Sequence, residues 1–220
     1  MKKVLILILL TTSINAQVDF DCFIGEESGD VNYYERQNSG AGSTSFSLVT
    51  GNSNSLNSVD VFQSSVEFVD IDGDGDQDCF IGEDDGTINY YRNTGNSGSA
   101  TFTVQTGGDN PFNGVDVGTK SVPAFIDIDG DGDQDCFIGE YDGTINYYKN
   151  EGNSSSPTFT LTTGGSNPFN GADVGWSSDP AFVDIDGDGD QDCFVGEFYG
   201  TIKYYKNTGN SSSATFTLQT

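Results

Sequence analysis

The sequence contains no histidine, and it has only one tryptophan and one methionine among its 220 residues. The absence of histidine excludes histidine-based general acid–base catalysis, and it disfavours zinc and copper sites, in which imidazole is a common ligand. Basic residues are also scarce, since 8 Lys and Arg stand against 34 Asp and Glu and give a net charge of −26. Such an acidic surface repels nucleic acid and anionic lipid, so neither is expected as a partner.

Long hydrophobic runs are absent after the first residues. Lys2 and Lys3 open the chain, an apolar run follows at 4–10, and residues 11–16 are small or polar. The run is too short to span a bilayer, so residues 1–16 are predicted to be a cleaved signal peptide rather than an N-terminal anchor. No lipid-attachment cysteine follows the run directly. The mature chain is therefore expected to start at Gln17, to be secreted or held at the cell surface, and not to insert into a membrane.

A repeat of fixed period dominates the sequence. The string DIDGDGDQDC begins at Asp70, Asp127 and Asp184, which are evenly spaced, and Cys22 precedes Cys79 by the same interval. An earlier fourth copy therefore exists, although it has no acidic loop. A fixed period of this length indicates a solenoid, a propeller or an array. The predicted repeat domain spans residues 17–220, with units at approximately 17–63 (partial), 64–120, 121–177 and 178–220.

Each full unit contains four short segments that are typical of β-strands. In the third copy they are residues 124–128, 136–140, 144–149 and 158–162, all rich in β-branched or aromatic residues and bounded by turn residues. This pattern predicts an all-β fold of propeller-type blades, each with four antiparallel strands. About four units, the first incomplete, would make either an open arc or a small ring. The end blades of an open arc would expose apolar faces, which favours self-association.

The acidic loops carry the clearest signal of chemistry. Fifteen aspartates fall in three loops of five each, and calcium takes about six to eight oxygen ligands. Carboxylates at loop positions 1, 3, 5 and 9 and a backbone carbonyl at position 7 supply most of these oxygens, while glycines at positions 4 and 6 let the loop curl. About three Ca²⁺ ions are therefore predicted. Their ligands would be Asp70, Asp72, Asp74, Asp76 and Asp78; Asp127, Asp129, Asp131, Asp133 and Asp135; and Asp184, Asp186, Asp188, Asp190 and Asp192.

Three other interpretations of the loops are weaker. A solvated acidic hairpin without an ion would suffer strong repulsion among its carboxylates. Magnesium prefers fewer protein ligands and a rigid octahedral geometry. An EF-hand requires flanking helices and a glutamate at position 12, where this chain has Ile81, Ile138 and Val195.

The segment PAFVDIDGDGDQDCFVGE at 180–197, followed by GTIKYYKNTG at 200–209, resembles the FG-GAP-like, or VCBS, repeats. Related blades of integrin α-subunits carry a calcium-binding hairpin between their first and second strands. The resemblance covers nearly the whole mature chain, and it implies a calcium-binding propeller-type fold and an extracellular setting. It also implies that Asp76, Asp133 and Asp190 contribute carbonyl oxygens. The chain departs from the family in its cysteines, where aliphatic residues are more usual, and in having fewer blades than the closed propellers.

Other repeated residues are expected to be structural. Cys22, Cys79, Cys136 and Cys193 share one strand position, and packed sheets lie too far apart for disulfides between them, so buried free thiols are predicted. The tyrosine pairs at 33–34, 90–91, 147–148 and 204–205 are expected to pack between blades rather than to form a ligand-stacking surface. Glu83, Glu140 and Glu197 recur with the blades and are expected to support turns.

The sequence predicts a non-catalytic protein, because no nucleophile–base set and no unrepeated segment to hold one is visible. The favoured function is an extracellular binding or adhesion module with structural calcium and an unidentified protein or glycan ligand. The alternatives are a structural spacer or fragment of a larger cell-surface protein, and a non-catalytic accessory module of a secreted enzyme.

Overall fold

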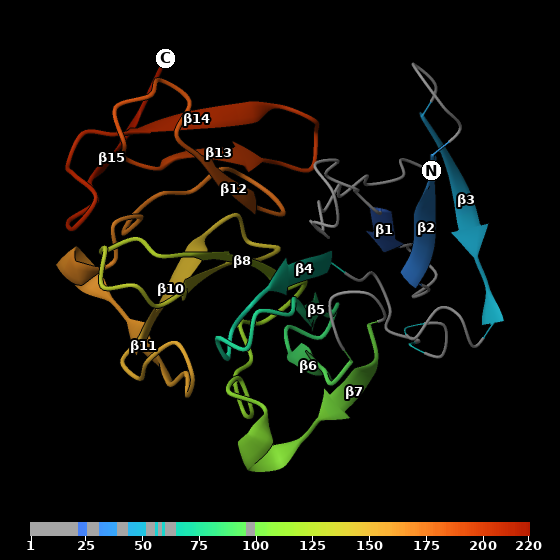
Figure 1. Ribbon diagram of the computed structural model, residues 1–220. Coiled ribbons are helices and arrows are strands. Elements are labelled where there is room, and N and C mark those ends of the chain that lie inside the picture. The colour runs from blue at the N-terminus through green and yellow to red at the C-terminus, as the bar shows by residue number, and fades with distance from the viewer. Residues whose placement is uncertain are drawn as a thin grey trace.

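The computed structural model describes residues 22–25, 31–38, 44–51, 56, 59, 65–95 and 100–220. Its strands form four antiparallel sheets that follow one another around the molecule (Figure 1), and the described helical residues form only short 3-10 turns such as Gly107–Asp109 and Gly164–Ser166. The predicted all-β fold is confirmed. The predicted signal peptide at residues 1–16 lies outside the described residues.

Each sheet is an antiparallel meander, here called a blade, in which consecutive strands pair. Blade 1 contains β1 (Cys22–Gly25), β2 (Val31–Asn38) and β3 (Thr44–Val49). Blade 2 contains β4 (Ser65–Val69), β5 (Asp78–Gly82), β6 (Ile88–Asn93) and β7 (Phe102–Gln105). Blade 3 contains β8 (Val122–Ile126), β9 (Asp135–Gly139), β10 (Ile145–Asn150) and β11 (Phe159–Thr162). Blade 4 contains β12 (Asp179–Val183), β13 (Asp192–Gly196), β14 (Ile202–Asn207) and β15 (Phe216–Leu218).

The first strand of blade 3 begins earlier than the sequence predicts. β8 starts at Val122 rather than at residue 124, and Pro123 within it pairs with Ile138 of β9. Proline lacks the N–H that a central strand needs, and it is tolerated here because β8 is an edge strand of its sheet. β12, with Pro180, repeats this arrangement in blade 4.

The hydrophobic core lies between the blades. Ile145 and Tyr147 of β10 pack toward blade 4, whereas Tyr148 packs toward blade 2. This division follows from the alternation of side chains along a strand, and it confirms the predicted packing between blades for the tyrosine pairs at 90–91 and 147–148. Of the pair at 204–205, only Tyr205 belongs to one of these clusters. Cys193 belongs to the first of these interfaces and Cys136 to the second, whereas Cys79 lies in the cluster between blades 1 and 2.

Three of the predicted free thiols are confirmed. Cys79, Cys136 and Cys193 are buried and unpaired, and burial raises the pKa of each thiol. A raised pKa keeps the thiol protonated and unreactive, so these residues act as small apolar core residues. The predicted free thiol of Cys22 lies outside the described side chains.

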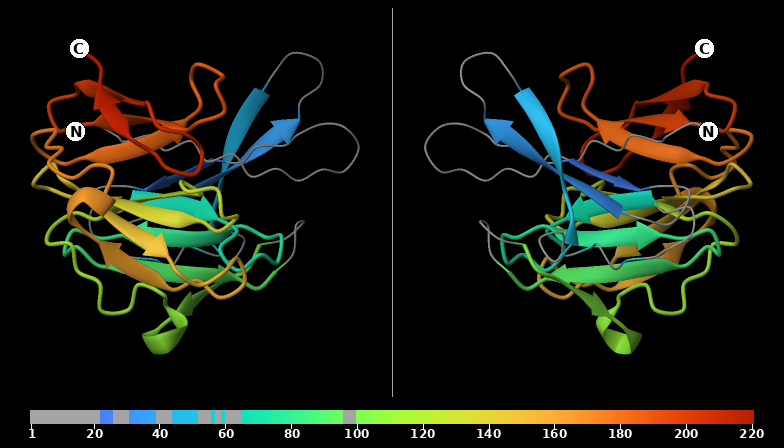
Figure 2. Two further views of the ribbon diagram at one scale, coloured as in Figure 1. Left: turned by 90° about the vertical axis from the view of Figure 1, so that its left-hand side faces the viewer. Right: turned by 90° about the vertical axis from the view of Figure 1, so that its right-hand side faces the viewer.

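The first strands of the blades meet at the centre of the molecule. β8 contacts both β4 and β12, and β1 contacts β4 (Figure 2). Residues of β4, β8 and β12 line an open pocket of about 330 Å³; they are Ser65, Glu67, Val122, Pro123, Ala124, Phe125, Asp179, Pro180, Ala181 and Phe182. Two acidic residues of the pocket are not repeated from blade to blade. The positions equivalent to Glu67 are alanine in blades 3 and 4, and the positions equivalent to Asp179 are Ser65 in blade 2 and Val122 in blade 3. Burial and, to a lesser extent, the charge of Asp179 raise the pKa of Glu67 to about 7.

We expect the substitution Glu67→Gln to stabilise the protein at pH 8 but not at pH 4.5. A carboxyl whose pKa is raised on folding holds its proton more tightly in the native state, so the wild type loses stability as pH rises from the ordinary value of 4.5 through about 7. Glutamine resembles the neutral acid and escapes this loss, which amounts to about 1–3 kcal/mol. Equilibrium unfolding at several pH values measures the difference. The exposed Asp142→Asn removes the same charge elsewhere, and an equal gain from that variant would assign the effect to net charge instead.

Candidate metal centres

Each acidic loop joins the first and second strands of its blade. In blade 3 the loop lies between Ile126, which ends β8, and Asp135, which begins β9. Gly130 and Gly132 have φ angles of 74° and 93°, a left-handed region that glycine adopts without strain. The corresponding glycines of the other two loops have closely similar angles. The loops therefore curl as the sequence predicts.

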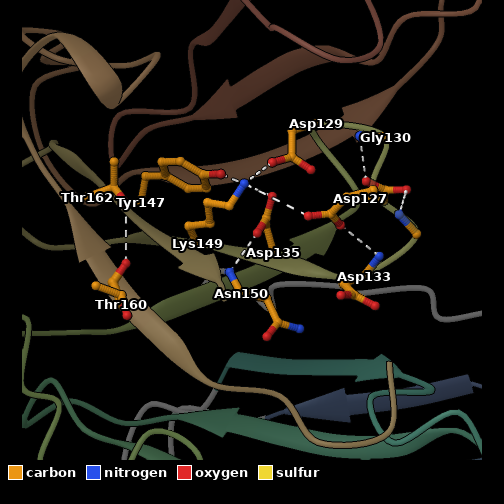
Figure 3. A network of polar contacts seen from close by, with 12 residues as sticks. Asp127, Asp129, Gly130, Asp133, Asp135, Tyr147, Lys149, Asn150, Thr160 and Thr162 are labelled. Atoms are coloured by element: carbon orange, nitrogen blue, oxygen red, sulfur yellow. Dashed lines mark hydrogen bonds and ion pairs between the residues drawn. The ribbon is translucent and has the colours of Figure 1, made fainter. Parts of the chain in front are cut away.

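The first aspartate of each loop holds the curl in place through backbone amides. Asp127 accepts the N–H of Gly130 on Oδ1 at 2.7 Å and the N–H of Gly132 on Oδ2 at 3.0 Å (Figure 3). Asp131 Oδ1 accepts the N–H of Asp133 at 3.0 Å. Asp184 makes the same two bonds in blade 4. The loop backbone thus fixes where these carboxylates lie before any ligand binds.

The aspartates at positions 1, 3 and 5 of each loop, which are its first three aspartates, converge on one point. In all three loops, one carboxylate oxygen from each of these residues lies within 4.8 Å of the other two; the clusters are Asp70, Asp72 and Asp74; Asp127, Asp129 and Asp131; and Asp184, Asp186 and Asp188. Among the described residues, Asp70 Oδ1 and Asp129 Oδ1 are buried oxygens without a hydrogen-bond donor. A buried unpaired acceptor is costly, and a hard cation would satisfy it. The residues present therefore fit a calcium ion.

The aspartate at position 9 of each loop, which is its last, is buried. Asp135 Oδ2 accepts the hydroxyl of Tyr147 at 3.0 Å, and its Oδ1 accepts the N–H of Asn150 at 2.7 Å. Asp78 and Asp192 have equivalent partners. Burial raises the pKa of Asp135 to about 6 and that of Asp78 to about 7. These carboxylates therefore tie the loop to the third strand.

Ion binding by the aspartates at loop position 9 stays a prediction, as does ion binding by the backbone carbonyl groups at position 7. The charges of Asp72 and Asp74 contribute to the raised pKa of Asp78, so the buried carboxylate lies within the electrostatic field of the cluster. Asp76, Asp133 and Asp190 are partly exposed and lie between the cluster and this buried residue along the chain.

A basic residue reaches each cluster, and the sequence analysis did not single it out. Arg92, Lys149 and Lys206 come from the third strand of their blades. Lys149 Nζ contacts Asp129 and lies 3.9 Å from Asp131 (Figure 3). Burial opposes ionisation of Asp129, but the Lys149 ammonium outweighs it and lowers the pKa of that carboxyl. The repeat could have revealed these residues, because three of only 8 basic residues recur at the same position of the repeat.

Replacing Lys149 with methionine should strengthen calcium binding at the second loop, roughly threefold to tenfold, because it removes a like charge beside the ion. The same change should destabilise the calcium-free protein by about 0.2–1 kcal/mol, since a partly exposed ion pair is lost. Melting with calcium and with chelator tests both effects as a widened gap between the two temperatures.

Lys203→Met is the matched control, because Lys203 Nζ donates to the Asp173 carbonyl and not to an acidic loop. An equal widening in both variants would assign the effect to net charge and contradict the role given to Lys149.

The repeated glutamates brace the hairpin turns, as the sequence predicts. Glu140 Oε1 accepts from Asn146 at 3.0 Å, and Glu197 Oε1 accepts the N–H of Thr201 at 2.9 Å. The first bond ties the turn between the second and third strands of blade 3 to the third strand, and the second lies within the corresponding turn of blade 4.

An exposed aromatic row lies beside these turns in blades 3 and 4. Trp176 lies 5.2 Å from Tyr141 and 6.4 Å from Phe198, and Phe198 lies 5.3 Å from Tyr199, all between ring centroids. Trp176, Phe198 and Tyr199 are exposed. The row is not repeated from blade to blade, because the residue one repeat period before Trp176 is Thr119. That departure was the sequence signal that could have identified it.

Fold and loops together define an all-β repeat protein whose blades 2, 3 and 4 each present a convergent aspartate cluster. Residues 127–195, which contain the second and third loops, match the FG-GAP-like repeat family. The predicted resemblance is thereby confirmed for this stretch. A comparison with curated proteins gives no significant match. None of the helices in the described part of the chain has the length and apolar character needed to span a bilayer.

Proposed function

We propose that this chain is a secreted calcium-binding β-repeat protein that acts as a non-catalytic extracellular binding or adhesion module. The observation that carries the proposal is the convergence of three carboxylates in each of three loops, with oxygens within 4.8 Å of one another. The FG-GAP-like match at residues 127–195 supports an extracellular-type repeat module.

Calcium suits these clusters better than other cations. It is a hard ion that prefers carboxylate and carbonyl oxygens and tolerates irregular geometry, whereas magnesium demands a regular octahedron. The chain has no histidine to select zinc or copper. When bound, the ion would neutralise carboxylates that otherwise repel one another, and its role would be structural. Asp127 would orient the loop while Asp129 and Asp131 complete the cluster.

The aromatic row is the surface that we assign to an extracellular protein or glycan ligand. Aromatic side chains offer a large apolar area with little loss of conformational freedom, and they are enriched in binding surfaces. Lys120 Nζ lies 5.6 Å from the centroid of Tyr141 and adds a charged group at one end of the row. A glycan and protein array probed in calcium would identify the ligand, and the absence of any ligand would favour the structural-spacer alternative.

The calcium half of the proposal is tested by stoichiometry. Calorimetric titration of the mature chain should give about three ions, and the double substitution Asp127→Ala with Asp131→Ala should give about two, because each loop belongs to its own blade and repeat stability is roughly a sum of local terms. Substituting the exposed Asp142 and Glu151 with alanine removes the same charge without touching a loop and should leave three. No binding in the wild type would sink the proposal, and a fall from three ions to none would show that the sites are interdependent.

A further inference from the structure

Blades 2, 3 and 4 carry the same apolar residues on one face, here called the leading face. It is formed by Val69, Ile71, Phe80, Ile88 and Tyr90 in blade 2; by Ile126, Ile128, Phe137, Ile145 and Tyr147 in blade 3; and by Val183, Ile185, Phe194, Ile202 and Tyr204 in blade 4. The members of each set are separated from their counterparts by one period of the repeat.

Burial of this face differs sharply between the blades. Ile71 and Ile128 are 2% and 6% exposed, but Ile185 is 57% exposed. Ile145 is 3% exposed, whereas Ile202 is 71% exposed. Val183 is exposed as well. Since the residues are equivalent in sequence and strand position, the difference comes from what packs against them.

The next blade covers the leading faces of blades 2 and 3. On blade 3 the covering residues are Cys193, Val195 and Tyr205 of blade 4, together with Phe169 of the connecting segment. On blade 2 they are the counterparts of these residues, Cys136, Ile138, Tyr148 and Phe112. The molecule thus contains two examples of the surface that fits a leading face: the opposite, trailing face of a blade of the same type.

Polar contacts repeat in the same two interfaces. Ser178 Oγ accepts the N–H of Glu140 at 2.9 Å and donates to the Thr144 carbonyl at 2.6 Å, and Ser121 does the same in blade 2. A side chain on Gly139 would meet the Ser178 carbonyl at 2.2 Å. At the equivalent Gly196 the nearest described atom is the Asp179 Cβ at 3.7 Å, so the space that the neighbour occupies elsewhere is open.

The acidic loops show the same difference. The space beside Gly130 is filled by the Ser211 carbonyl of blade 4, and that beside Gly73 by the Ser154 carbonyl of blade 3. At Gly187 of the third loop no described atom lies within 4 Å of the equivalent position. The neighbouring blade therefore completes the surroundings of the first two loops but not of the third.

Blade 1 repeats the strand pairing of the blades that cover a leading face. Its Cys22 pairs in register with Tyr34, as Cys79 pairs with Tyr91, Cys136 with Tyr148 and Cys193 with Tyr205. Tyr33 packs against blade 2, so its neighbour Tyr34 lies on the opposite, trailing face. We propose that the leading face of blade 4 binds the trailing face of blade 1 in a second copy of the chain, giving head-to-tail association.

The two faces differ, so this contact is heterologous, and it generates a larger ring or an open row according to its angle. It goes beyond the proposed function, since it requires neither calcium nor a ligand. Its strength must exceed the repulsion between two chains of net charge −26, and physiological salt screens that repulsion.

Sedimentation velocity of the mature chain over a range of concentrations tests the proposal. We expect concentration-dependent association. Ile202→Lys and Val183→Lys should each abolish it, raising the dissociation constant by roughly a hundredfold, because the interface would bury an unpaired ammonium. Both side chains are exposed, so melting temperatures should not change. Leu161→Lys is the control, since Leu161 is exposed in blade 3 although that blade is packed on both faces. Each variant reduces net negative charge, so added repulsion would not explain a loss of association.

A mixing experiment tests whether the contact joins the leading face of one chain to blade 1 of another. Unlabelled Ile202→Lys in excess should cap labelled wild type as heterodimers, because its blade 1 remains intact. A wild type that stays monomeric at every concentration overturns the proposal, as does unchanged association of both blade 4 variants. An inert Ile202→Lys in the mixture would show that two leading faces pair with each other, which also refutes the head-to-tail contact.

Discussion

Calcium should raise the melting temperature of this protein by roughly 8–16 °C over that measured in chelator. An ion at ten times its dissociation constant stabilises the native state by about 1.4 kcal/mol per site, or about 4 kcal/mol for three independent sites. For a chain of 150–250 residues, about 1 kcal/mol corresponds to roughly 2–4 °C. The physical reason is that the ion removes the repulsion within each aspartate cluster and satisfies the unpaired oxygens of Asp70 and Asp129.

Differential scanning calorimetry with calcium, with magnesium and with chelator measures this effect. Magnesium should give a much smaller shift, because the loops offer many flexible oxygen ligands rather than a rigid octahedron. The double alanine variant at Asp127 and Asp131 should retain about two thirds of the shift. Identical melting temperatures with calcium and chelator would refute structural calcium altogether.

The second large effect is expected in the core. Phe137 is fully buried between blades 3 and 4, with its ring 4.6 Å from Tyr147, 4.9 Å from Phe182 and 5.5 Å from Phe169. Phe137→Ala should cost about 3–5 kcal/mol of unfolding free energy, because the transfer free energy of the ring and its packing are both lost. Chemical denaturation at low chain concentration measures the loss.

Phe194 provides a matched control, because it occupies the same position of the repeat on the uncovered face of blade 4. Its stacking partner is Tyr204 at 4.7 Å, and its ring is only partly buried. Phe194→Ala should therefore cost less than half as much as Phe137→Ala. Equal losses would mean that the cover supplied by the next blade adds nothing, which would contradict the core described above.

Much of the fold could be predicted from the sequence because it depends on local patterns. Alternation of apolar residues specifies the strands, and turn residues delimit them. The left-handed angles of Gly130 and Gly132 are what a curled loop of alternating aspartates requires. The convergence of Asp127, Asp129 and Asp131 follows from that curl.

Other features could not be predicted in this way because they join segments that are distant along the chain. Lys149 reaches Asp129 from a different strand, and nothing in its own neighbourhood marks it as a partner of the loop. Glu67 shares the open pocket with Asp179, which is more than a hundred residues away. The early start of β8 depended on its place at the sheet edge, where proline is tolerated.

The sequence by itself determined the repeat period, the antiparallel blades, the aspartate clusters and the buried thiols, because each repeats within one unit and is specified by local backbone geometry. Only the tertiary structure decided which leading faces are covered. Ile145 and Ile202 have the same chemistry and the same strand position, yet one is 3% and the other 71% exposed. Burial is a property of the neighbour as well as of the residue, and blade 3 has its neighbour in blade 4.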